Sequence, residues 1–179
     1  MRITISGPPG SGKTTVCEKL SSALSFKAVV FGKIFRELAE ERNLTLSELG
    51  SLAEKDPSID ELIDSRLVRI ARENDNIVLE SRLAAYMLTR NNIPAFRVYL
   101  DASPDVRAGR IGARDNETFG ESLKKTAERQ SSEEKRYMKY YGIDINDTEV
   151  YDMMISTDHT EADDVVRMIL GELEARGCL

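Results

Sequence analysis

The chain has 179 residues, of which 41% are hydrophobic and 31% are charged, and its formal net charge is −6 at pH 7. These values are ordinary for one folded domain, residues 1–179, and they do not indicate disorder. The negative charge argues against binding along a nucleic-acid backbone, so any anion site has to be local.

The cysteine content and the lack of long apolar runs bear on location. Cys17 and Cys178 are far apart in the sequence, which suggests neither a disulfide framework nor a zinc site and fits a reducing compartment. No leader segment and no run of about 18 apolar residues is seen. We expect a cytoplasmic monomer with small-molecule substrates and with neither a nucleic-acid nor a membrane partner.

Five short apolar runs predict strands, namely Arg2–Ser6, Lys27–Phe31, Asn76–Glu80, Phe96–Asp101 and Tyr151–Ser156. Each run is continuous rather than alternating, which is typical of strands covered on both faces. Helical spacing of apolar residues lies between the runs, as in Leu62, Val68 and Ile70. The alternation predicts an α/β fold in which helices flank a five-stranded parallel sheet.

Residues that commonly begin or end helices separate the predicted helices from one another. Asn43 and Gly177 are predicted to end helices, and Asp56-Pro57 and Ser103-Pro104 are predicted to begin them. The polar stretch Asp115–Gly120 is predicted to be a mobile loop between two helices.

A glycine-rich segment follows the first predicted strand. Gly7-Pro8-Pro9-Gly10-Ser11-Gly12-Lys13-Thr14 matches the pattern G-x-x-x-x-G-K-[ST] between a strand and a helix, the context that this phosphate-binding motif requires. Its backbone N–H groups and the helix N-terminus attract a polyphosphate. Lys13 is predicted to reach the β- and γ-phosphates of ATP, and Thr14 to offer its hydroxyl to Mg²⁺.

Two groups of arginines have helical spacing. Arg107, Arg110 and Arg114 are three and four residues apart, so one helix face could present them to a cleft that holds phosphates. Arg129, Glu133 and Arg136 repeat this spacing as cation, carboxylate and cation. Taken alone, both groups are equally compatible with a solvated, salt-bridged helix face.

Charged residues also follow the predicted strands. Arg36 and Arg82 fall beyond the second and third strands, where open α/β sheets bind ligands, although surface positions are the alternative. Glu80 and Asp101 each end a strand, and either carboxylate could order the waters of a Mg²⁺ ion. His159 has no catalytic partner in the sequence and is predicted to be structural or exposed.

These residues resemble the nucleoside monophosphate kinases and, among them, the short cytidylate kinases typical of archaea. The resemblance runs end to end and is carried by Ser6–Thr15, Gly32–Arg36, Leu79–Ala84, Leu100–Pro104, Arg107–Ile111, Arg129–Tyr137, Tyr141–Asp144 and Tyr151-Asp152. It implies a P-loop fold with an acceptor-binding region at about residues 32–75 and a short lid at about residues 110–125 that closes over ATP.

The resemblance also implies roles for particular residues. The loop from Gly7 to Thr15, together with Arg110 and Arg114, would bind ATP, and Glu133 would face the sugar of the acceptor. The acceptor phosphate or the transferring phosphoryl group would be bound by Arg36, Arg82, Arg129 and Arg136, with Glu80 in the same region. Lys13, Arg110, Arg129 and Arg136 are then the predicted catalytic groups, and cytidine monophosphate (CMP), with its deoxy form, is the predicted acceptor.

The chain departs from the family in two places. Ser81 stands where the family usually has glycine, so its side chain could either crowd the acceptor or hydrogen-bond it. The chain also lacks the large insert with which bacterial cytidylate kinases read the cytosine, so the resemblance does not identify base-reading residues.

Two alternatives remain open at the level of the sequence. The first is another small-molecule kinase of the same fold, acting on adenylate, uridylate or a non-nucleotide such as shikimate. The second is a nucleotide-dependent switch that binds a protein partner, which would hydrolyse ATP slowly without stimulation by monophosphates. The chain contains no N-K-x-D guanine-binding motif and no strand that ends in paired Asp-Glu, which argues against the switch.

Overall fold

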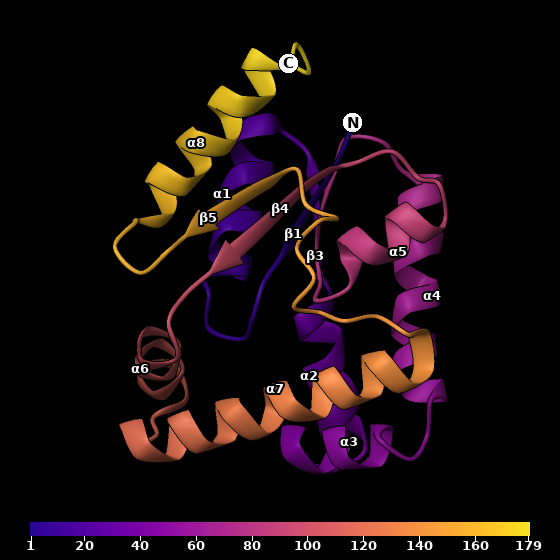
Figure 1. The fold of residues 1–179 in the computed structure, drawn as a ribbon, viewed down its shortest axis with the longest axis vertical. Coiled ribbons are helices and arrows are strands. Elements are labelled where there is room, and N and C mark those ends of the chain that lie inside the picture. Colours follow the sequence, from indigo (N-terminus) through magenta and orange to yellow (C-terminus); the bar gives the residue numbers. More distant parts are fainter.

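The computed structural model describes residues 1–179 and contains one parallel sheet with the strand order β2-β3-β1-β4-β5 (Figure 1). The strands are β1 (Arg2–Ser6), β2 (Lys27–Val30), β3 (Ile77–Glu80), β4 (Phe96–Asp101) and β5 (Met153–Ser156). The predicted α/β fold with five parallel strands is confirmed. Three predicted bounds shift slightly: Phe31 already starts a helix, β3 begins at Ile77 rather than Asn76, and the last strand begins at Met153 rather than Tyr151.

Eight helices connect and cover the strands. They are α1 (Lys13–Leu24), α2 (Phe31–Glu41), α3 (Leu46–Ala53), α4 (Ser58–Glu73), α5 (Ala84–Arg90), α6 (Pro104–Asp115), α7 (Phe119–Tyr141) and α8 (Ala162–Ala175). The predicted helix ends are confirmed at these positions: Asn43 and Gly177 have positive φ just after α2 and α8, and Ser103 caps α6 ahead of Pro104.

Apolar side chains from both faces of the sheet form two cores. In β3, Ile77 and Leu79 pack on the side of α4 and α5, whereas Val78 packs on the side of α1 and α8. Figure 1 shows α1 and α8 next to each other at one side of the sheet and α4 with α5 at the other. Because both faces are covered, β3 presents apolar residues to both of them, which explains its continuous hydrophobic run.

The apolar stripe of α4 differs from the one that the sequence suggested. Its core residues are Ile59, Ile63 and Leu67, which recur every four residues, whereas Leu62 is 58% exposed. The prediction that Leu62 belongs to the packed face is therefore wrong. No helix in the structure is both long enough and apolar enough to cross a lipid bilayer.

Half of the predicted loop Asp115–Gly120 lies in helices, so the loop between the two helices is shorter than the sequence interpretation gave it. Asp115 ends α6, and Phe119 and Gly120 lie in the first turn of α7. The cause is a capping box, in which Thr118 and Glu121 satisfy each other's backbone N–H groups. The connection is thus only residues 116–118, and α7 runs from there past α6 and α3 (Figure 1).

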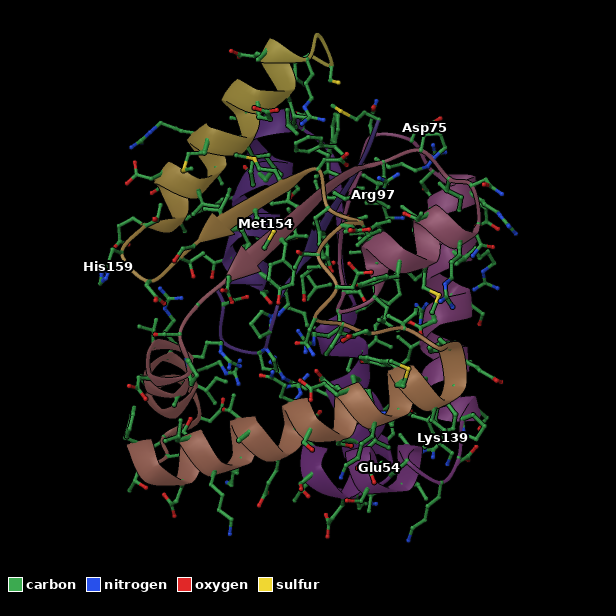
Figure 2. All side chains as sticks on the ribbon, viewed as in Figure 1. Glu54, Asp75, Arg97, Lys139, Met154 and His159 are labelled. Carbon is green, nitrogen blue, oxygen red and sulfur yellow. The ribbon has the colours of Figure 1, made fainter.

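His159 lies in the loop between β5 and α8, and its side chain is exposed (Figure 2). The sequence interpretation of this histidine as structural or exposed is confirmed.

Candidate active site

A cavity of about 510 Å³ opens at the carboxyl ends of the strands, between the first turn of α1, α2, α4, α6 and α7. Most of the predicted site residues line it, namely Pro9, Gly10, Ser11, Gly12, Lys13, Thr14, Thr15, Arg36, Glu80, Arg82, Arg110, Arg114, Arg129, Glu133 and Arg136. Gly7 and Pro8, the first two residues of the glycine-rich loop, are buried and do not line the cavity. The fold thus gathers residues that are more than 120 positions apart in the sequence.

The glycine-rich loop can adopt its path only with glycine at particular positions. A Cβ atom on Gly7 would lie 2.1 Å from the carbonyl oxygen of Leu100 in β4, so the loop packs against the sheet too closely for any side chain. Gly12 has a φ of 87° and directly precedes α1, and the space around it is open. This conformation leaves the N-terminus of α1 facing the cavity, where backbone N–H groups favour an anion.

Lys13 is the first residue of α1, and its ammonium lies over the loop. Its Nζ donates to the carbonyl oxygen of Pro8 at 2.8 Å. Burial lowers the pKa of Lys13 to about 7, and Arg82 and Arg129 lower it further, against the opposing effect of two glutamates. A polyphosphate in the cavity would supply negative charge and stabilise the ammonium form.

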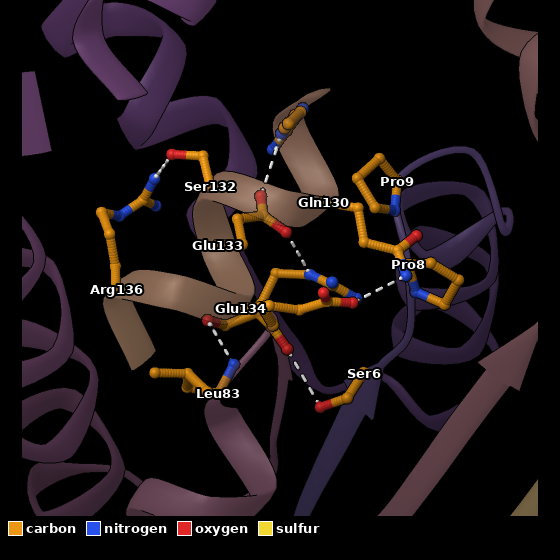
Figure 3. A network of polar contacts seen from close by, with 12 residues as sticks. Ser6, Pro8, Pro9, Leu83, Gln130, Ser132, Glu133, Glu134 and Arg136 are labelled. Atoms are coloured by element: carbon orange, nitrogen blue, oxygen red, sulfur yellow. Dashed lines mark hydrogen bonds and ion pairs between the residues drawn. The ribbon is translucent and has the colours of Figure 1, made fainter. Parts of the chain in front are cut away.

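Glu133 on α7 is the centre of a charged network (Figure 3). Its two carboxylate oxygens accept from Nε of Arg82 at 2.6 Å and from Nε of Arg129 at 3.0 Å. Burial alone would raise the pKa of Glu133, but Arg82, Arg129 and Arg136 together lower it to about 2. The carboxylate therefore stays ionised and fixes two guanidinium groups that keep other N–H donors free for a ligand.

Arg36 on α2 lines the same cavity as this network. Burial lowers the pKa of Arg36, and the neighbouring charges of Arg114 and Arg129 lower it further. Three guanidinium groups from three helices thus act on one another through the same cavity. An anion with several charges would relieve this repulsion, as expected of a phosphate site.

Arg136 lies in the cavity wall but is already held by the protein. Its Nε and Nη2 donate to the two carboxylate oxygens of Asp60 on α4, at 2.8 Å and 3.4 Å, and its Nη1 donates to Ser132 (Figure 3). Only 3% of its side chain is exposed. Arg136 therefore joins α7 to α4, in addition to adding positive charge to the cavity.

The three arginines of α6 do not share one environment, which corrects the expectation that all three converge on the cleft. Arg107 is buried under the glycine-rich loop and donates to the carbonyl oxygens of Ala102 and Pro9. Arg110 and Arg114 do line the cavity. The first turn of α6 packs against the loop, and this contact takes Arg107 out of the ligand site.

Arg110 is braced against the end of β5 and the glycine-rich loop. Its Nη2 donates to the carbonyl oxygen of Thr157 at 2.6 Å, and its Nη1 donates to the Thr157 hydroxyl at 2.9 Å. That hydroxyl in turn donates to the carbonyl oxygens of Ser11 and Asp101. Arg114 instead forms two hydrogen bonds with the neighbouring Asp115 and is largely exposed.

The residues that were predicted near Mg²⁺ lie in different environments. The Thr14 hydroxyl lies 3.4 Å from a carboxylate oxygen of the buried Glu80, whereas Asp101 is exposed and does not line the cavity. No cluster of three or more His, Cys, Asp or Glu side chains suited to a metal is present. One hydroxyl and one carboxylate beside a phosphate loop suit Mg²⁺, which keeps several waters and binds substrate phosphates. The geometry therefore favours Glu80 over Asp101.

Several cavity residues were missed by the sequence interpretation. They are Phe31, Phe35, Asp60, Ile63, Asp64, Tyr137 and Thr157. Thr157 could have been found, because it directly follows the last strand at the ligand-binding edge. Ser81, the departure from the family pattern, lines the cavity, but its Oγ accepts from the N–H of Leu83. The Ser81 side chain thus accepts a hydrogen bond from the backbone just before α5.

The parallel sheet, the glycine-rich loop at the start of α1 and the arginine-lined cavity define a protein with the P-loop kinase fold. The family model for the cytidylate kinase-like family matches residues 2–159. The chain belongs to this family, and the resemblance inferred from its motifs is confirmed.

Comparisons with known proteins agree with this assignment. The chain is 44% identical over 169 residues to the cytidylate kinase of Sulfurisphaera tokodaii, covering 94% of this chain and 93% of that protein. It is 45% identical over 175 residues to the cytidylate kinase of Halobacterium salinarum, covering 98% and 90%. A shikimate kinase from Bacteroides thetaiotaomicron shares the fold, with a TM-score of 0.63, 19% identity and coverage of 97% and 98%.

Proposed function

We propose that this protein transfers the γ-phosphoryl group of ATP to CMP, and to its deoxy form, giving ADP and the cytidine diphosphate. The observation that carries this proposal is the ring of guanidinium groups opposite the glycine-rich loop, in a chain similar along its length to proteins named cytidylate kinase. The proposal includes a monomer that acts in the cytoplasm.

The donor nucleotide is assigned to the side of the cavity formed by α1 and α6. The N-terminus of α1 and Lys13 would hold the β- and γ-phosphates. Arg110 and Arg114, which line the cavity from α6, would lie along the same polyphosphate. The braces from Arg110 to Thr157 fix the position of that guanidinium before any ligand binds, so little ordering is left to be done on binding.

The phosphate of the acceptor is assigned to the opposite side. Arg36, Arg82 and Arg129 surround the space that faces Lys13, and Glu133 holds two of these guanidinium groups in place. Arg136 adds a further positive charge behind them while it is paired with Asp60. Glu133 is assigned a positioning role, since both of its oxygens already accept from arginines.

The reaction needs placement and charge neutralisation rather than a general base. A phosphate oxygen of CMP, ionised at neutral pH, would attack the γ-phosphorus, and the bond from that phosphorus to the β-phosphate oxygen would break as ADP leaves. The arginines and Lys13 lie between the two polyanions and offset both their repulsion and the charge that develops in transfer. When bound near Thr14 and Glu80, Mg²⁺ would supply further charge neutralisation at the β- and γ-phosphates.

A panel of acceptors tests this function. We expect ADP release from ATP and Mg²⁺ to be fastest with CMP and dCMP, and slower with UMP, AMP and shikimate, in a coupled assay. Slow hydrolysis that no acceptor stimulates would identify a nucleotide-dependent switch instead. Faster turnover with UMP, AMP or shikimate would show that the fold is correct and the acceptor is wrong.

Binding of ATP should be coupled to proton uptake at Lys13. The pKa of Lys13 is about 7, and phosphate charges favour the ammonium form, so a Lys13 that is neutral at pH 8.5 should gain up to about one proton on binding. The uptake should vanish near pH 6, where the ammonium is already charged. Calorimetric titrations in buffers of different ionisation enthalpy measure it, and the matched control is Lys13→Arg, whose side chain stays charged. Equal uptake in both proteins would contradict the assignment.

A further inference from the structure

The wall of the cavity contributed by α4 carries two buried carboxylates one turn apart, Asp60 and Asp64, which are 4% and 7% exposed. Asp60 is paired with Arg136. Asp64 makes no ion pair, and the hydroxyl of Tyr141 is the neighbouring protein group that can donate to it. Taking a carboxylate out of water without a partner is costly, so buried carboxylates usually have donors. One hydroxyl uses only part of the acceptor capacity of a carboxylate, so a further donor for Asp64 is expected from a ligand.

Asp64 lies away from the phosphate-binding end of the cavity. It lies on the α4 wall, one turn after the Asp60 that pairs with Arg136, whereas Lys13 lies at the start of α1 beside the glycine-rich loop. Figure 1 shows α4 on the opposite side of the molecule from α6. An acceptor whose phosphate is held among the arginines would extend the rest of its structure toward α4.

The same end of the cavity has flat aromatic walls. Phe35 on α2 and Tyr137 on α7 both line it, and the guanidinium carbon of Arg136 lies 6.0 Å and 5.5 Å from the centroids of their rings. Aromatic and guanidinium planes are the surfaces on which planar bases stack. A buried hydrogen-bond acceptor beside such surfaces suits the edge of a base that carries an amino group.

We propose that Asp64 accepts a hydrogen bond from the exocyclic amino group of the acceptor's cytosine and thereby selects cytosine over uracil nucleotides. This inference rests on the proposed function and assigns its base-reading residue. A carboxylate is the side chain expected to accept from the amino group at N4 of cytosine. Uracil has a carbonyl oxygen at the corresponding position, which an ionised carboxylate would repel.

The protonation of Asp64 is consistent with this role. Burial raises the pKa of Asp64 to about 7, against a lowering by the nearby Tyr141 hydroxyl and by Arg136. The Tyr141 oxygen is itself buried without a hydrogen bond. An amino donor from a ligand would stabilise the ionised carboxylate and remove the cost of its burial.

The test compares CMP with UMP in the wild type and in Asp64→Asn. The amide has nearly the same shape, but it can donate as well as accept, so it can pair with either base edge. We expect the ratio of kcat/KM for CMP to that for UMP to fall by at least about tenfold. Tyr141→Phe removes the hydroxyl beside Asp64 and is the matched control, in which the ratio should stay within about twofold of the wild type.

A second measurement uses the wild type alone, with a pyrimidin-2-one ribonucleotide that lacks the amino group. We expect its kcat/KM to be at least about tenfold below that for CMP. The inference is overturned if Asp64→Asn keeps the wild-type ratio, if Tyr141→Phe lowers the ratio equally, or if the analogue reacts as well as CMP. Absence of CMP turnover in the wild type overturns the proposed function itself, so the two failures are distinguishable.

Discussion

Lys13→Met should lower kcat for CMP phosphorylation by about 10³-fold without reducing the thermal stability of the protein. The ammonium lies at the N-terminus of α1 and over the glycine-rich loop, where charge on the transferring group has to be offset. Burial lowers the pKa of Lys13 to about 7, so the fold disfavours this charge rather than depending on it. Replacement by an apolar side chain of similar length removes a desolvated ammonium and should leave folding intact.

Lys19→Met is the matched control for that variant. Lys19 lies on the same helix, but its side chain is 43% exposed and pairs with an exposed Asp163, a type of contact that contributes little. We expect wild-type turnover and a melting temperature within about 2 °C of the wild type. Steady-state kinetics and thermal melts of the wild type, Lys13→Met and Lys19→Met measure both effects. Near-normal turnover in Lys13→Met would show that Lys13 has no catalytic role.

The parts of the fold that follow from local chemistry could be predicted from the sequence. The glycine-rich segment folds as expected because its own glycines permit the path of the loop. The bounds of β1 and β4 were also predicted correctly, with β1 running from Arg2 to Ser6 and β4 ending at the polar Asp101. The extent of the loop between α6 and α7 was overestimated, although Thr118 and Glu121 have the spacing of a capping box and indicated a helix start three residues before Glu121.

The parts of the site that depend on tertiary packing could be predicted only in part. Helical spacing correctly grouped Arg129 with Glu133, because residues four apart share a helix face. It could not separate the buried Arg107 from the exposed Arg114, since that difference is set by the glycine-rich loop packed on the first turn of α6. Asp60 was missed because its partner Arg136 is 76 residues away, and a pair of aspartates on a helix suggests a solvated surface.

The ion pair between Asp60 and Arg136 leads to the largest expected effect on stability. Arg136→Met should reduce the free energy of unfolding by about 3–5 kcal/mol, because it leaves Asp60 buried without its partner. That loss is a large part of the roughly 5–15 kcal/mol typical of a folded domain. Urea denaturation at pH 8 measures it. Exposed Arg167, which pairs with Asp164 on the surface of α8, provides the control Arg167→Met, which should change stability by less than about 1 kcal/mol.

The destabilisation of Arg136→Met should shrink as the pH falls from 8 to 5. Burial already raises the pKa of Asp60 although Arg136 opposes the shift, and removal of that cation should raise the pKa further. A group whose pKa is higher in the folded than in the unfolded protein binds protons preferentially when folded, so lowering the pH restores stability. An equal loss at both pH values would mean that Asp60 is not the source of the cost.

The double variant Asp60→Leu/Arg136→Met separates stability from function. Since burial outweighs the attraction of Arg136 in setting the pKa of Asp60, the pair offsets its own desolvation only partly, and two apolar side chains should recover most of the lost stability. Turnover should not recover with it, because the cavity then lacks one of its cations. Recovery of both stability and turnover would show that Arg136 serves the fold alone and that the acceptor is held by Arg36, Arg82 and Arg129 without it.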